Sequence, residues 1–250
     1  MRELLVIGIG PGDPDQITVK AVAALNRVDV FFVVDKGERK SGLLEVRDEI
    51  LRRHVTRPHR IVTIADPPRD RGAEAYEGAV ADWHAARAER FTAALDELGP
   101  DGVGAFLVWG DPALYDSTLR VIDDMIAAGA QFRHEVIAGV TSVHALAAAH
   151  RVPLNRIGEP IHITPARRIE GGLPAGLDSA VVMLDRGFTA AGLDPDLEIF
   201  WGAYLSTPDE VLVSGRLGDV ADEITRLRAE LREKHGWIMD TYLLRSRSHE

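Results

Sequence analysis

The chain has 250 residues, of which 46% are hydrophobic and 27% charged, an ordinary balance for a folded globular protein. It contains no cysteine, which excludes disulfides, thiolate metal sites and cysteine nucleophiles. The net charge of −10 argues against nucleic acid as the main partner, and an anionic substrate would need a local group of arginine and lysine. Without a long apolar run or a signal pattern at the N-terminus, we expect a cytoplasmic protein that does not enter a membrane.

The first element sets the organisation of the chain. Residues 4–9 are an unbroken apolar run, which predicts a strand buried on both faces of a parallel sheet. A bare turn follows, with glycines that let the backbone approach a ligand and a proline that stiffens it: Gly8, Gly10, Pro11 and Gly12. Asp13 stands where a dinucleotide-binding turn needs its third glycine, so the sequence disfavours a Rossmann oxidoreductase.

Alternating strands and helices continue to about residue 150. We expect strands at 28–34, 60–64, 103–109 and 132–137, and helices at 17–27, 43–54, 73–98, from 116, and up to His150. From Pro153 strands follow in quicker succession, at 161–164, 180–184, 197–205, 210–216 and 237–244, with a charged helix at 220–234. The pattern predicts an α/β protein of two domains, 1–118 and 119–250, the second with a mixed sheet, and a frayed tail at 245–250.

Small residues recur where predicted strands end. Gly110, Asp111 and Pro112 follow one strand, and residues 138–142 follow another. Because ligands bind at the carboxyl ends of strands in open α/β sheets, these turns and the first are expected to line one crevice. Asp111 either binds a ligand hydroxyl or caps the helix that begins near Asp116. The charged segment 35–40 follows a strand at the same edge, where it is either part of the site or a solvated loop.

Other common chemistries have no motif in the chain. His144 and His150 are six residues apart, about 240° around a helix, so they do not share a metal-binding face. The patterns of zinc peptidases, nucleotide-triphosphate-binding loops and serine hydrolases are absent. We therefore expect no metal site.

Four ordered segments, covering almost the whole chain, resemble the tetrapyrrole methylases, which methylate corrin and sirohaem precursors with S-adenosylmethionine. These segments are residues 8–14, 110–112, 138–142 and 207–217. The resemblance implies two αβα domains with the cofactor in the cleft between them, in a homodimer. Relatives often have proline where this chain has Ala138, which should cost the turn some rigidity.

The resemblance also implies which residues hold the cofactor. In the first turn they are Gly10, Pro11 and Gly12, and in the second Gly110, Asp111 and Leu114. Thr141 and Ser142 contribute from the third turn, while Leu184 and Ala203 stand where the family presents backbone groups to the adenine.

Within the family, the chain most resembles the deacetylating methylase of the aerobic cobalamin pathway. The features are residues 34–40, 66–71, 114–119 and 150–155, and residues 35–37 replace a segment that most members share. The reaction implied methylates ring carbon 1 of precorrin-5 and expels acetate. Methyl transfer needs alignment rather than a base, because the macrocycle is itself the nucleophile.

Deacetylation needs more, because water must add to a carbonyl group. Our hypothesis is that Asp35 or Asp111 activates the water, with Tyr115 or Lys36 near the acetyl oxygen. Asp116 is a weaker candidate base because helix capping explains it as well. The substrate carboxylates would be bound by cations in loops near the expected cleft, unless these only form a solvated rim: Lys36, Arg39, Lys40, Arg69 and Arg71.

Three other functions compete with this one. The chain could be a methylase of the same fold with another substrate, either a different corrin precursor or, as in diphthine synthase, a protein histidine. A non-catalytic binder of S-adenosylmethionine or of a tetrapyrrole is the alternative from another class. The oxidoreductase is the outsider, and failure to bind a nicotinamide cofactor would remove it.

Overall fold

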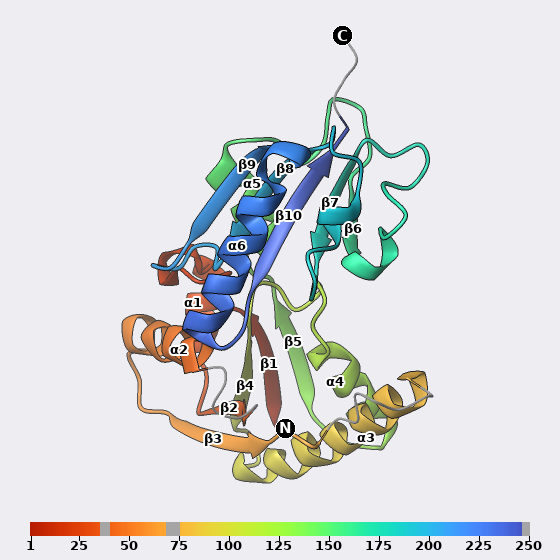
Figure 1. The fold of residues 1–250 in the computed structure, drawn as a ribbon. Helices are drawn as coiled ribbons and strands as arrows, with labels where there is room; N and C mark the ends of the chain where they lie inside the picture. Colours follow the sequence, from red (N-terminus) through yellow and green to blue (C-terminus); the bar gives the residue numbers. More distant parts are fainter. Residues whose placement is uncertain (36–40, 69–75, 247–250) are drawn as a thin grey trace. The chain divides into compact units, whose positions relative to one another are not determined.

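The computed structural model describes residues 1–35, 41–68 and 76–246 (Figure 1). It divides into two compact units, Met1–Val140 and Thr141–Glu250. The prediction of two α/β domains is confirmed, but the boundary predicted at 118/119 is wrong. The reason is that β5 (Arg133–Ile137) pairs in parallel with β1 (Glu3–Gly8), which makes it part of the first sheet.

The first unit contains a five-stranded parallel sheet in the order β3-β2-β4-β1-β5. Its other strands are β2 (Val30–Asp35), β3 (Arg60–Ala65) and β4 (Val103–Val108). Apolar runs predicted β1, β2 and β4 because a central parallel strand is covered on both faces. Along β1, Leu5 and Ile7 enter one core cluster while Leu4 and Val6 enter another.

Helices cover both faces of this sheet (Figure 1). α1 (Val19–Leu25) and α2 (Ser41–His54) pack on the face of the sheet that carries Leu5. A short helical turn, Pro14–Gln16, precedes α1 in the chain. α3 (Tyr76–Ala94), its extension Leu95–Glu97 and α4 (Thr118–Ala127) pack on the other face. No helix in the described ranges has both the length and the apolar character required to cross a membrane.

The second unit is built on a five-stranded mixed sheet in the order β6-β7-β10-β8-β9. The strands are β6 (His162–Pro165), β7 (Ser179–Met183), β8 (Glu198–Ala203), β9 (Val211–Arg216) and β10 (Asp240–Arg245). β6 and β7 are parallel and the other pairs antiparallel, so the predicted mixed sheet is confirmed.

One helix packs on each face of the second sheet. α6 (Leu217–His235) buries Ile224 against Trp201 and Tyr242, and it ends at Gly236, whose positive φ of 73° suits a helix terminus. α5 (Ser142–His150) covers the other face, where a Cβ on Gly202 would lie 3.0 Å from the Leu146 side chain. Shorter helical turns lie at Ala166–Arg168 and Thr189–Gly192.

The predicted tail begins too early. Arg245 is the last residue of β10, is 8% exposed, and donates from Nη2 to the carbonyl oxygen of Pro153 at 2.6 Å. Ser246 still bonds to Asp178 through its backbone N–H. Residues 247–250 lie outside the described part of the chain.

Candidate functional site

The turns that follow β1 and β4 meet backbone to backbone. Gly10 N–H donates to the Gly110 carbonyl at 3.3 Å, and Gly110 N–H donates to the Gly10 carbonyl at 2.8 Å. Both glycines have positive φ, 82° and 68°, which a residue with a side chain adopts only with strain. Two of the three predicted turns therefore form one surface at the carboxyl edge of the sheet.

The turn after β5 packs equally closely against them. A Cβ on Gly139 would lie 2.1 Å from the Gly110 carbonyl oxygen, and one on Gly8 would lie 2.6 Å from Gly139 N. Neither distance leaves room for a methyl group, so glycine is required where the three turns touch. The sequence presented Gly8 and Gly139 only as members of motifs, because their mutual contact depends on the strand order β4-β1-β5.

Asp111 joins two of these turns through its carboxylate. One oxygen accepts from Ala113 N–H at 2.8 Å, and the other accepts from Gly139 N–H at 2.8 Å. Near the start of α4 it is Asp116 that accepts from Thr118 N–H, at 2.7 Å, while the N-cap residue, Ser117, makes no side-chain capping hydrogen bond. Asp111 therefore holds the second and third turns in register.

The other predicted cofactor residues of the first unit shape the same turns. Pro11 and Gly12 are buried, and Leu114 N–H donates to the Asp111 carbonyl at 3.3 Å. The first turn then passes into the Pro14–Gln16 helical turn, where Asp13 accepts from Asp15 N–H at 2.8 Å. These contacts define backbone geometry, as a rigid ligand-binding turn requires.

Asp35 lies at the end of β2, and Tyr115 lies in the segment between the neighbouring strand β4 and α4. Asp35 is the exposed last residue of β2, and β2 pairs with β4. Tyr115 has a positive φ of 53° and is 43% exposed. The predicted cations Lys36, Arg39, Lys40, Arg69 and Arg71 lie outside the described residues.

A buried ion pair supports this edge from the α3 side. Arg87 is 4% exposed and donates to both carboxylate oxygens of Asp66, at 2.7 and 3.1 Å, and to Ser117 Oγ at 3.0 Å. The guanidinium also lies over the Trp83 ring, 4.1 Å from its centroid. The segment after β3 is thereby tied to the start of α4.

Thr141 and Ser142 belong to the second unit, where they begin α5. Thr141 Oγ1 accepts from His144 N–H at 3.3 Å and lies 2.7 Å from His144 Nδ1. His150 Nε2 lies 2.9 Å from the Trp201 carbonyl oxygen. In the described ranges, no three histidine, aspartate or glutamate side chains converge as a metal site would need.

Leu184 and Ala203 lie at one edge of the second sheet. β7 and β8 are both antiparallel to β10, which lies between them, so their carboxyl ends share an edge. Leu184 has a φ of 57° and is 60% exposed, whereas Ala203 is fully buried and pairs with Asp240. An exposed left-handed leucine is uncommon and is held by its surroundings.

Asp185 supplies that support. Its carboxylate accepts from Gly187 N–H at 3.1 Å, from Thr189 N–H at 2.7 Å and from the Tyr242 hydroxyl at 2.7 Å. Burial and the adjacent Asp185 carboxylate raise the pKa of Tyr242, which therefore stays a hydrogen-bond donor. No sequence signal pointed to Asp185, because its partners are spread over two other elements.

A second buried polar group lies beside it. Arg228 Nε is 2.8 Å from Asp240 Oδ2, an ion pair without the alignment of a hydrogen bond, and Arg228 Nη2 donates to the Asp185 carbonyl at 2.6 Å. Asp240 also accepts from Trp201 Nε1 at 2.8 Å. Burial raises the pKa of Asp240, and the Arg228 charge opposes that rise.

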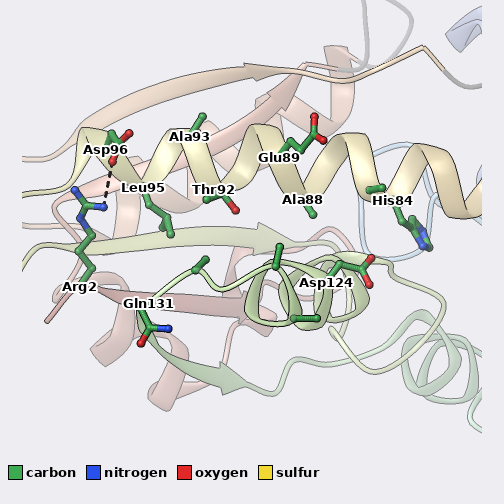
Figure 2. A pocket seen from close by; sticks show the side chains of 14 residues that line it. Arg2, His84, Ala88, Glu89, Thr92, Ala93, Leu95, Asp96, Asp124 and Gln131 are labelled. Atoms are coloured by element: carbon green, nitrogen blue, oxygen red, sulfur yellow. Dashed lines mark hydrogen bonds and ion pairs between the residues drawn. The ribbon is translucent and has the colours of Figure 1, made fainter.

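A cavity of about 780 Å³ lies elsewhere in the first unit, between α3 and α4. Figure 2 shows alanines on its walls, with Arg2 bonded to Asp96 at one end and His84 at the other. None of the predicted site residues in the described ranges lines it. We place the candidate site at the carboxyl ends of the strands of the first sheet, where the glycine turns meet.

Comparisons with known proteins place the chain in a family. The family model for tetrapyrrole (corrin/porphyrin) methylases matches residues 3–221. The chain is 50% identical to precorrin-6A synthase [deacetylating] of Sinorhizobium sp, over 98% of this chain and 95% of that protein.

Solved structures share the fold. One is a cobalamin synthesis related protein, CobF of Corynebacterium diphtheriae, with a TM-score of 0.85 and 37% identity. The alignment covers 99% of this chain and 100% of that protein. A uroporphyrin-III C-methyltransferase of Thermus thermophilus, complexed with S-adenosyl homocysteine, has a TM-score of 0.59 and 21% identity, over 97% and 91% of the two chains. The chain belongs to the tetrapyrrole methylase family.

Proposed function

We propose that the protein is an S-adenosylmethionine-dependent C-methyltransferase of aerobic cobalamin biosynthesis. It converts precorrin-5 to precorrin-6A by methylating ring carbon 1 and releasing acetate. The observation that carries the proposal is 50% identity, over 98% of the chain, to a precorrin-6A synthase [deacetylating]. A homodimer in the cytoplasm, acting without a metal and without nucleic-acid or membrane partners, completes the proposal.

The glycine turns fit the cofactor. Gly10 and Gly110 have no side chains, so an amino-acid-like end of a ligand can approach the backbone of their turns closely. Asp111 fixes the spacing between the turns, and Leu184 and Ala203 remain the predicted adenine contacts. S-adenosylmethionine supplies an electrophilic methyl group, and the protein's part is to hold the acceptor carbon in line with it.

Acetyl removal requires a base for the attacking water. Both Asp111 oxygens accept backbone N–H groups that hold the turns together, so we assign the base to the other candidate, Asp35, which is exposed to solvent at the end of β2. Asp35 takes the proton as the water oxygen adds to the acetyl carbonyl carbon, and Tyr115 or Lys36 donates to the developing oxyanion. The carbon–carbon bond then breaks, acetate leaves, and the electron pair returns to the ring for methylation.

Mass spectrometry of the product tests the reaction. Purified protein is incubated with S-adenosylmethionine and precorrin-5 generated in situ by upstream enzymes. We expect an acetyl group to be replaced by a methyl group, with acetate detected. A gain of one methyl with the acetyl retained would identify a different corrin methylase, and no mass change despite calorimetric cofactor binding would indicate another acceptor or a binding role.

Replacement of each aspartate separates the two roles. We expect Asp35→Asn to lower the rate of acetate release at least about 100-fold, the usual contribution of a general base, with cofactor affinity unchanged. Asp111→Asn leaves one oxygen to accept the two backbone N–H groups that the carboxylate binds, so the contact between the second and third turns weakens. This should weaken cofactor binding as well as turnover. Single-turnover acetate assays and calorimetry measure both. Acetate release at the wild-type rate in Asp35→Asn would refute the base assignment.

A further inference from the structure

Arg47 occupies an unusual place on α2. It lies on the same helical stripe as Ile50 and Leu51, which are 0% and 6% exposed and pack on the sheet. Arg47 lies one helical turn before Ile50 and Leu51, so it is on the face of α2 that packs on the sheet, not on the solvated face. Because α2 follows β2, its first turns lie toward the carboxyl edge of the sheet, where the candidate site is.

The Arg47 guanidinium lacks a partner within the described part of the chain. Its Nε atom is inaccessible and has no hydrogen-bond acceptor, and none of the ion pairs there includes it. Burial lowers the pKa of Arg47, and the nearby charges of Asp116 and Asp48 offset this only in part. The Asp116 carboxylate already accepts from Thr118 N–H at the start of α4. By contrast, Arg52 on the same helix donates to Glu49 from Nε and Nη2 at 2.7 and 2.6 Å.

A second unpaired donor lies in the same region. Trp109 directly follows β4, and its indole Nε1–H is buried with no acceptor among the described residues. Trp109 and Val46, the neighbour of Arg47, pack against the same hydrophobic cluster. Two buried N–H donors without acceptors cost stability, and groups that carry such a cost are typical of functional sites.

We propose that Arg47 binds a carboxylate of the tetrapyrrole substrate. A planar guanidinium can donate two parallel bonds to a carboxylate, and a bound carboxylate would neutralise a charge that the described part of the fold compensates only in part. The inference rests on the proposed function, since a corrin precursor carries several carboxylates while the cofactor carries one. Arg47 adds to the predicted cations of the loops a cation that is fixed on a helix.

The test compares Arg47→Gln with Arg52→Gln, a matched control on the same helix whose side chain is 70% exposed. Arg47→Gln should raise KM for precorrin-5 about tenfold or more, the loss expected for a charged hydrogen bond, and leave S-adenosylmethionine affinity by calorimetry unchanged. Its ligand-free melting temperature should match the wild type or exceed it, because an unpaired buried charge is removed. Arg47→Lys should recover part of the affinity, and Arg52→Gln should leave both constants unchanged.

The outcomes separate the inference from the proposed function. Wild-type protein that makes no product from precorrin-5 would overturn the proposed function and the inference with it. Product formation with an unchanged KM in Arg47→Gln would overturn the inference alone. A lower melting temperature in Arg47→Gln, with weaker binding of both ligands, would assign Arg47 a structural role and also overturn it.

Discussion

Replacing Gly139 by alanine is expected to destabilise the first unit by about 3 kcal/mol, the upper end of the range for overpacking a close contact. The added Cβ would stand 2.1 Å from the Gly110 carbonyl oxygen and 2.8 Å from Gly8 C, both backbone atoms of central strand ends. No side-chain rotation relieves this contact, so the turns must separate. The hydrogen bond from Gly139 N–H to Asp111 would then be lost, and cofactor binding with it.

Urea unfolding followed by circular dichroism, together with calorimetry of S-adenosylmethionine, measures both effects. Gly99→Ala is the matched control, because a Cβ at Gly99 meets no atom within 4 Å. We expect the control to keep wild-type stability and affinity. If Gly139→Ala were as stable as Gly99→Ala and still bound the cofactor, the close packing of the three turns would not be what maintains the site.

The sequence predicted the central strands of the first sheet well, because these strands contain runs of consecutive apolar residues, most of which are buried. β1 is apolar from Leu4 to Ile7, as a strand covered on both faces must be. β5 gave the wrong domain boundary for the opposite reason. It is an edge strand in which only Ile137 is buried, and its pairing with β1 has no signature in its own residues.

The turns were predictable and their contacts were not. Glycines after strands point to ligand-binding turns, and the structure joins Gly10 to Gly110 as that prediction requires. The Asp111 carboxylate looked equally suited to catalysis, to ligand binding or to capping. Its bond to Gly139, 28 residues away, depends on strand order, which single-sequence patterns do not define. Nothing in the sequence singled out Arg47 or Asp185, because their importance depends on burial and on their contacts, which residue type alone does not reveal.

The second large effect is expected from Arg228→Met. The change leaves the Asp240 carboxylate, whose side chain is 3% exposed, without its cation and should cost about 3–5 kcal/mol of unfolding free energy near pH 8. The loss extends to the segment beside Leu184, a predicted adenine contact, since Arg228 also donates to the Asp185 carbonyl. Methionine fills most of the vacated volume, so lost charge pairing rather than a cavity dominates the cost.

The pH dependence identifies the cause. Burial already raises the pKa of Asp240, and removing Arg228 takes away an interaction that lowers it. When folding raises the pKa of a carboxyl group, the folded state loses stability as the pH rises from the pKa in the unfolded chain toward the pKa in the folded protein. Below the unfolded-chain pKa, about 4 for aspartate, the group causes no loss. The stability difference between variant and wild type should therefore shrink as the pH falls from 8 toward 4.

Adding Asp240→Asn to Arg228→Met completes the argument. The amide oxygen can still accept from Trp201 Nε1, and the double variant has no buried charge to neutralise. Urea midpoints at pH 8 should place it above Arg228→Met alone, with little dependence on pH. Equal losses at all pH values and no recovery in the double variant would instead attribute the effect to the contact of Arg228 with the Phe188 ring, 5.5 Å from its centroid.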